Sequence, residues 1–165
     1  MMKWIGITGG IATGKSTVTQ RLRTLGYDVL DADEVAHRVT DLVLPQIFQT
    51  FGESVKNPDG SLNRKALGAL IFGHEEQRKE LEAIIHPLVR VQVAAEKSQL
   101  EKSGRAVAFY GVPLLYEKQM EKDFDAVILV SSTPDLQLER LQKRNSLGEI
   151  EALARVKSQI PLKDK

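Results

Sequence analysis

The stretch most suited to chemistry is a glycine-rich loop near the N-terminus. Residues 9–16 read Gly-Gly-Ile-Ala-Thr-Gly-Lys-Ser, which fits the pattern of glycine, four residues, then Gly-Lys-Ser/Thr. Glycine lets backbone N–H groups turn towards a polyphosphate, and Lys15 adds a charge that can reach the β- and γ-phosphates. The Ser16 hydroxyl can ligate a Mg²⁺ ion that bridges those phosphates. The pattern therefore predicts a binding site for a nucleoside triphosphate.

The elements that must hold this loop surround it in the required order. An apolar run at residues 4–7 predicts a short buried strand before it, and Val18, Leu22 and Leu25 follow it at helical spacing. A helix that begins near Lys15 points its unpaired N–H groups and the positive end of its dipole at the phosphates. The alternative is a plain glycine-rich turn that carries a lysine by chance, and these flanking elements argue against it.

Two carboxylates follow the next apolar segment. Residues 27–33 predict a second short strand that ends in Asp31 and Asp33, before a helix that is entered at Glu34. Ligands bind beyond the carboxyl ends of the strands in an open parallel sheet, so both carboxylates are expected on the edge that carries the loop. A carboxylate in front of a helix can also be its cap. We expect one of the pair to cap the helix and the other, with Asp33 favoured, to act in catalysis.

Residues 34–104 carry an almost wholly helical pattern. Helices are expected at residues 44–51, 64–72, 75–85 and 88–103. Asn63 is expected to cap the second of these, and His86-Pro87 to separate the last two. About seventy residues of helix between two strands is more than a crossover connection needs. We interpret the segment as a helical insertion that forms a substrate-binding subdomain.

Strand patterns return at residues 106–113 and 125–130, with a short helix expected between them at 114–120. Thr133-Pro134 opens a further helix, and a last one is expected at 148–159. Arg140 and Arg144 lie four residues apart on the first of these two helices and so share a face. They form either a solvated charged stripe or a contact to phosphate, because arginine suits the charge of a phosphoryl-transfer transition state.

These elements predict an α/β protein of three layers with a parallel sheet, the fold of P-loop nucleotide kinases. Right-handed crossovers favour the strand order 2-3-1-4. Residues 1–33 and 105–165 are expected to form the kinase core, with residues 34–104 inserted into it.

Composition narrows the function further. The formal charge of the 165 residues is +1, so no broad basic surface argues for a nucleic-acid partner. The chain has no cysteine, which excludes disulfides and thiolate metal sites and suits the cytoplasm. No apolar run is long enough to cross a membrane, and the N-terminus leaves no room for a signal peptide. Neither an Asn-Lys-X-Asp motif nor an acidic run after an apolar strand occurs, so a small-molecule kinase is favoured over a switch or a motor.

Six segments in register resemble one family, that of dephospho-coenzyme A kinase. They are Gly6-Ile-Thr-Gly-Gly-Ile-Ala-Thr-Gly-Lys-Ser-Thr17, Leu30-Asp-Ala-Asp33, Asp59-Gly-Ser-Leu-Asn-Arg64, Ile85-His-Pro87, Pro113-Leu-Leu-Tyr-Glu117 and Gln137-Leu-Glu-Arg140. They cover nearly the whole chain in the family's order, and the combination is far more specific than the loop alone.

The resemblance implies ATP- and Mg²⁺-dependent phosphorylation of the ribose 3′-hydroxyl of dephospho-coenzyme A, the last step of coenzyme A synthesis. It implies that Asp33 orients or deprotonates the acceptor hydroxyl near Mg²⁺, and that Arg140 stabilises the transferring group. Lys15 completes this catalytic set. The ATP phosphates would be held by Gly9, Gly10, Ala12, Thr13, Gly14, Lys15, Ser16 and Thr17, with Arg144 as a weaker candidate. Residues expected on the substrate side are Thr8, Asp33, Arg64, His86 and Glu117. His86 can equally be a plain helix-stop residue. For the whole protein, we expect a monomer or a weak homo-oligomer.

The chain also departs from the family pattern. Gly111 and Val112 stand where the family often has Asp, and the stretch between Val39 and Pro45 is a few residues short. The family continues past a segment similar to residues 158–162 into a further strand and helix, and this chain does not. We therefore expect it to be less stable and less active than a longer member. The alternatives to this function are another small-molecule kinase on the same fold and an ATP-binding module without catalysis.

Overall fold

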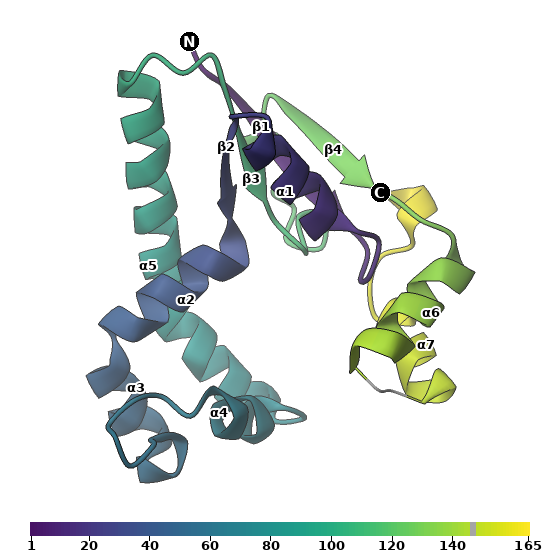
Figure 1. The fold of residues 1–165 in the computed structure, drawn as a ribbon. Helices are drawn as coiled ribbons and strands as arrows, with labels where there is room; N and C mark the ends of the chain where they lie inside the picture. The colour runs from purple at the N-terminus through teal and green to yellow at the C-terminus, as the bar shows by residue number, and fades with distance from the viewer. Residues whose placement is uncertain (146–147) are drawn as a thin grey trace. The chain divides into compact units, whose positions relative to one another are not determined.

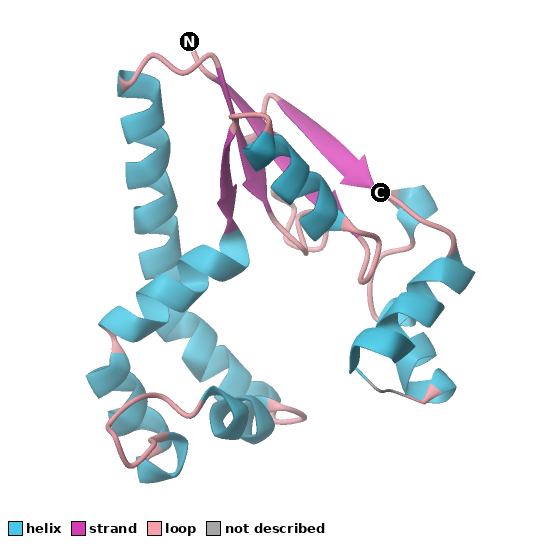
Figure 2. Cartoon of the chain, in the orientation of Figure 1, coloured by secondary structure: helices cyan, strands magenta, loops and turns pink. Residues whose placement is uncertain are grey.

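The computed structural model describes residues 1–145 and 148–165. The chain divides into two units, the first made of Met1–Ala32 with Leu100–Lys165 and the second of Asp33–Gln99. Figures 1 and 2 show the elements in chain order. They are β1 (Lys3–Gly9), α1 (Lys15–Thr24), β2 (Asp28–Asp31), α2 (Ala32–Leu42), α3 (Leu44–Phe51), η1 (Glu53–Val55), α4 (Arg64–Ile71), α5 (Glu75–Lys102), β3 (Val107–Gly111), η2 (Glu121–Asp123), β4 (Ala126–Val130), α6 (Pro134–Asn145), α7 (Glu149–Lys157) and η3 (Leu162–Asp164), where η marks a short 3₁₀ helix.

The first unit is built on a parallel sheet of four strands in the order β2-β3-β1-β4, which confirms the predicted order. In the register of the two central strands Lys3 pairs with Val107 and Ile7 pairs with Gly111. Ile7 and Ala108 are fully buried, as expected for central strands that are covered on both faces. The carboxyl ends of β1, β2 and β3 therefore lie along one edge, and the segments that follow β1 and β2 begin there.

Helix α1 stands directly after the glycine-rich loop and lies against the sheet (Figure 1). It ends at Thr24, and Gly26 takes the left-handed conformation that closes a helix, with φ +86°. The backbone N–H of Tyr27 donates to the Leu22 carbonyl at 3.1 Å, which completes this termination. The closing turn brings the chain back into β2 beside β3.

The second unit is helical and has its own apolar core. Ile47, Phe51, Val55 and Leu67 form the buried centre, and half-buried side chains of α5 pack against it. The bounds of α3 match the prediction, and the Asn63 side chain caps α4 by accepting a hydrogen bond from the Ala66 N–H at 3.0 Å. The capping signal at Asn63 therefore acts locally, as the sequence indicates.

Three local predictions were wrong. Helix α5 runs unbroken through Pro87, where a break was expected. A proline inside a helix removes one hydrogen bond, here to the carbonyl of Ala83, at about 3 kcal/mol, and the strong helix formers on both sides keep the helix continuous. Residues 113–119 are consecutive turns rather than a helix. The second strand ends at Asp31, so Asp33 lies in the first turn of α2 and not at a strand end.

Candidate active site

The glycine-rich loop holds a conformation that its small residues make possible. Gly14 has φ +101° and α1 begins at the next residue, while Ala12 also has a positive φ of 58°. A side-chain carbon at Gly9 would lie 2.5 Å from Thr13 Oγ1 and 2.7 Å from the Val130 carbonyl oxygen, so no larger residue fits there. Thr13 closes the loop by donating from Oγ1 to the Gly10 carbonyl at 2.9 Å. The N-terminus of α1 is thus presented as an anion-binding end.

The ammonium group of Lys15 is paired with a carboxylate at the end of β2. Lys15 Nζ lies 3.0 Å from Asp31 Oδ2, and the two side chains are only 15% and 14% exposed. Gly111 leaves room for this pair, because a side-chain carbon there would lie 3.1 Å from Asp31 Oδ2 and 3.2 Å from Lys15 Nζ. The departure at Gly111 therefore falls directly beside the charged pair of the site.

Helix α6 contacts the outer side of the loop. Arg140 donates from one guanidinium nitrogen to the carbonyl oxygens of Ala12 at 3.4 Å and Thr13 at 3.2 Å. Arg144, on the same helix, is exposed and donates to the side chain of its neighbour Asn145 at 2.9 Å. Arg140 is therefore the arginine that meets the loop in this structure.

The Glu139 carboxylate lies on the same helix as these arginines and is engaged locally. It pairs with Lys143 at 2.6 Å. A hydrogen bond and the charge of Lys143 hold the pKa of Glu139 below its usual value. Glu139 therefore stays ionised and serves as a surface ion-pair partner.

Thr8 and Glu117 occupy structural positions in the first unit. Thr8 is fully buried, and its hydroxyl donates to the Pro113 carbonyl at 3.3 Å. Glu117 accepts from the Ile160 N–H at 3.2 Å and pairs with Lys165 at 2.7 Å. Burial alone would raise the pKa of Glu117, but its bonds to Lys165 and to backbone N–H groups outweigh burial and lower the pKa. The carboxylate thus ties residues 160–165 to the segment after β3.

Three predicted site residues belong to the second unit. Asp33 is exposed, and its backbone carbonyl lies 3.1 Å from the ring Nδ1 of His37. Arg64 is the first residue of α4 and pairs with Asp41 at 2.6 Å. His86 lies half-buried inside the continuous α5, so it does not stop a helix. Each of these three side chains carries a group that can donate or accept a proton or hydrogen bond.

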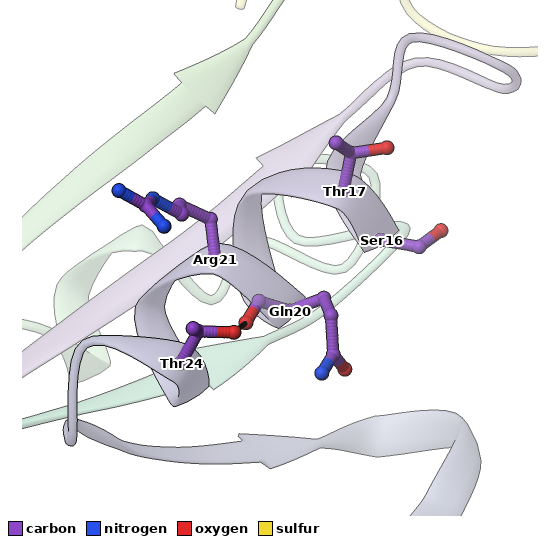
Figure 3. Close-up of a pocket in the computed structure, with 5 residues that line it drawn as sticks. All are labelled: Ser16, Thr17, Gln20, Arg21 and Thr24. Carbon is purple, nitrogen blue, oxygen red and sulfur yellow. Dashed lines mark hydrogen bonds between the residues drawn. The ribbon is translucent and has the colours of Figure 1, made fainter.

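Figure 3 shows a shallow hollow along the outer face of α1, lined by Ser16, Thr17, Gln20, Arg21 and Thr24. Ser16 and Thr17 are exposed, and their hydroxyl groups project from the first turn of the helix. Thr24 instead donates to the Gln20 carbonyl at 3.0 Å. The two hydroxyls after Lys15 are therefore accessible to a ligand at the loop.

The described residues contain no preformed metal cage. Within residues 1–145 and 148–165, no three His, Cys, Asp or Glu side chains gather closely enough to hold a metal ion. In the same residues no helix is long and apolar enough to span a bilayer.

Sequence reasoning missed the pairing of Asp31 with Lys15 and two glutamines that bind the loop. The signal that favours Asp31 is its place at the carboxyl end of a strand, on the sheet edge that carries the loop. The glutamines are Gln137, whose side chain donates to the Ile11 carbonyl at 2.8 Å, and Gln159, whose side chain accepts from the Ile11 N–H at 2.8 Å. No motif marks either of them.

A parallel sheet that ends in a phosphate loop, with a lysine and two hydroxyls at the start of the next helix, defines a P-loop nucleotide-binding protein. The family model described as dephospho-CoA kinase matches residues 3–165. The chain is 47% identical to the dephospho-CoA kinase of Anaeromyxobacter dehalogenans, over 99% of this chain and 79% of that protein. It is 43% identical to that of Bacillus anthracis, over 98% of this chain and 82% of that protein.

Solved structures agree with this result. The structure of TT1252 from Thermus thermophilus has a TM-score of 0.85 and 38% identity, covering 99% of this chain and 83% of that one. Dephospho-CoA kinase from Campylobacter jejuni has a TM-score of 0.72 and 30% identity, with the same coverage. The chain belongs to the dephospho-coenzyme A kinase family.

Proposed function

We propose that this protein transfers the γ-phosphoryl group of ATP to the ribose 3′-hydroxyl of dephospho-coenzyme A, giving coenzyme A and ADP. The observation that carries the proposal is the phosphate loop with its paired Lys15, in a chain with relatives at 47% and 43% identity that are named dephospho-CoA kinase. The hydroxyl oxygen forms the new bond to phosphorus, the bond from phosphorus to the ADP oxygen breaks, and the hydroxyl proton leaves.

The loop and α1 supply the charge that this reaction needs. Backbone N–H groups of the loop, the helix N-terminus and the Lys15 ammonium bind the β- and γ-phosphates, while the loop glycines allow the close approach. The Ser16 and Thr17 hydroxyls lie exposed at the same helix end. Arg140 stabilises the charge of the transferring group, and Arg144 is a second cation on its helix.

Mg²⁺ fits the donor set of this chain. Magnesium is usually held by substrate phosphates, waters and one or two protein oxygens, rather than by a protein cage. The described residues offer no such cage, whereas the Ser16 hydroxyl and the Asp33 carboxylate are both exposed oxygen donors. When bound, the ion neutralises charge that develops on the β- and γ-phosphates. We propose Ser16 and Asp33 as its protein ligands.

We assign the acceptor side to the residues that the family resemblance indicates. Asp33 takes the proton of the ribose hydroxyl, since its carboxylate is exposed at the first turn of α2. We propose that Thr8, near the end of β1, supports the acceptor side from its buried position. Arg64 and His86 in the helical unit, with Glu117, bind the coenzyme A part of the substrate, so residues 34–104 form the substrate subdomain. We place the reaction in the cytoplasm, where ATP is available, and expect a monomer or weak homo-oligomer.

The test measures ADP release with ATP and Mg²⁺, in the presence of dephospho-coenzyme A, of AMP, or of no acceptor. We expect release that depends on dephospho-coenzyme A. Asp33→Asn should lower kcat by at least about a hundredfold, because it removes a general base. ATP affinity should be largely kept, because Asn retains a side-chain oxygen that can ligate Mg²⁺. Asp135→Asn is the matched control, since Asp135 is also an exposed carboxylate in the first turn of a helix. ATP binding without turnover on any acceptor would instead favour a binding module.

A further inference from the structure

We propose that Gln137 and Gln159 are positioning residues that clamp Ile11 in the middle of the phosphate loop and preset the loop's peptide groups for phosphate. This inference deepens the proposed function and rests on it for its meaning in catalysis. The contacts themselves stand independently of which acceptor the enzyme uses.

Both backbone groups of Ile11 are bound by glutamine side chains that are far away in the sequence. Gln137 Nε2 donates to the Ile11 carbonyl oxygen at 2.8 Å, across 126 residues. Gln159 Oε1 accepts from the Ile11 N–H at 2.8 Å, across 148 residues. Figure 1 shows the loop after β1 beside the segment that follows α7. One residue of the loop is therefore held from two elements of the C-terminal part of the first unit.

The chemistry of the two contacts fixes the orientation of both amides. A carbonyl oxygen can only accept, so Gln137 must present its NH₂ group, and a backbone N–H can only donate, so Gln159 must present its oxygen. Gln137 is only 4% exposed. Because leaving a buried amide without a hydrogen bond is costly, its bond to Ile11 stabilises the folded loop. Gly10 provides its space, because a side-chain carbon there would lie 2.8 Å from Gln137 Nε2. The burial and the glycine indicate a built contact rather than a chance surface one.

The loop carbonyls that bind side chains of α6 point towards that helix, so the N–H groups of the same peptides point away from it. In a trans peptide the C=O and the following N–H point in opposite directions. The bond from Gln137 to the Ile11 carbonyl therefore directs the Ala12 N–H away from α6, and the bond from Arg140 to the Thr13 carbonyl does the same for Gly14 N–H. Inward N–H groups are what a phosphate loop uses to bind its anion. A preset loop needs less reorganisation when ATP binds and during transfer.

The first experiment uses the full chain and needs no substrate. Exchange of the Ile11 amide hydrogen is measured by NMR in wild type, Gln159→Met and Gln159→Glu. We expect Gln159→Met to speed this exchange about fivefold, which corresponds to about 1 kcal/mol for one hydrogen bond. Gln159→Glu should stay close to wild type, since it keeps an acceptor oxygen for the Ile11 N–H. Equal exchange in wild type and Gln159→Met would overturn the clamp.

The second experiment measures MgADP affinity by calorimetry, together with thermal midpoints and the two KM values. Gln137→Met and Gln159→Met should each weaken MgADP about fivefold and raise KM for ATP but not for dephospho-coenzyme A. Gln142→Met on the same helix is the control and should leave the affinity unchanged. Unchanged MgADP affinity in a folded Gln159→Met protein would refute the positioning role. A wild type that binds MgADP but phosphorylates no acceptor would refute the proposed function and leave the clamp standing.

Discussion

The ion pair between Lys15 and Asp31 should contribute measurably to the free energy of unfolding of the protein without nucleotide. We expect Lys15→Met, Asp31→Asn and the double variant to reveal a coupling energy of about 2 kcal/mol in the free energy of unfolding. At 3.0 Å the gross attraction is about 5 kcal/mol for an effective dielectric constant of about 20, before desolvation is subtracted. Exposed pairs retain about 0.2–1 kcal/mol, and breaking a buried pair costs about 3–5 kcal/mol. Side chains that are 15% and 14% exposed fall between these limits.

Urea unfolding of the four proteins without nucleotide measures this coupling. The matched control is the Arg105–Asp28 pair, which is also anchored on β2, has an N–O distance of 2.9 Å, and is 53% and 30% exposed. Its coupling should stay below about 1 kcal/mol, because solvent screens it. Equal coupling energies for the two pairs would show that burial at the loop does not strengthen the Lys15–Asp31 attraction, and the reasoning would fail.

The same variants also test how the Lys15–Asp31 pair affects nucleotide binding. If Lys15 leaves Asp31 for the phosphates, a coupling of about 2 kcal/mol is lost on binding, so Asp31→Asn should bind MgATP up to about thirtyfold more tightly. Asp28→Asn should bind it as wild type does. Weaker binding by Asp31→Asn would mean that Asp31 assists the nucleotide instead of competing for the lysine.

Three further perturbations test other parts of the structure. Asn63→Ala removes the cap on the Ala66 N–H and should lower the stability of the helical unit by about 1 kcal/mol in denaturant titrations. Ile47→Ala opens a cavity in the centre of the same unit's core and should cost about 2–5 kcal/mol by the same measurement. Glu117→Gln removes the pairing with Lys165 that lowers the Glu117 pKa from 4.5. Because a lowered carboxyl pKa stabilises the fold at higher pH, this variant should be less stable than wild type at pH 7, and the difference should fade in thermal melts as the pH falls below 4.5.

The sheet and the loop could be predicted because their signals are local. A continuous apolar strand, a glycine loop and an amphipathic helix each need only neighbouring residues, and the handedness of crossovers then fixes the strand order. The same is true of Asn63, whose side chain caps the helix that begins next to it. Local rules failed where two of them competed. At Pro87 the helix-breaking effect of proline was outweighed by the helix formers around it, and α2 began at Ala32, directly after Asp31 and one residue before Asp33.

The contacts that shape the site were not predictable in this way, because they join distant residues. Asp31 and Asp33 are equivalent in the sequence, and only the sheet register, which places Asp31 opposite Gly111, shows which carboxylate reaches Lys15. Gln137 and Gln159 carry no motif, and their function depends on a loop more than a hundred residues away. The loop sequence therefore specifies that phosphate can bind, whereas its geometry depends on side chains that a motif search does not include. A variant with an intact glycine loop can thus lose nucleotide affinity through α6 or the segment after α7, without any change in the residues that touch ATP.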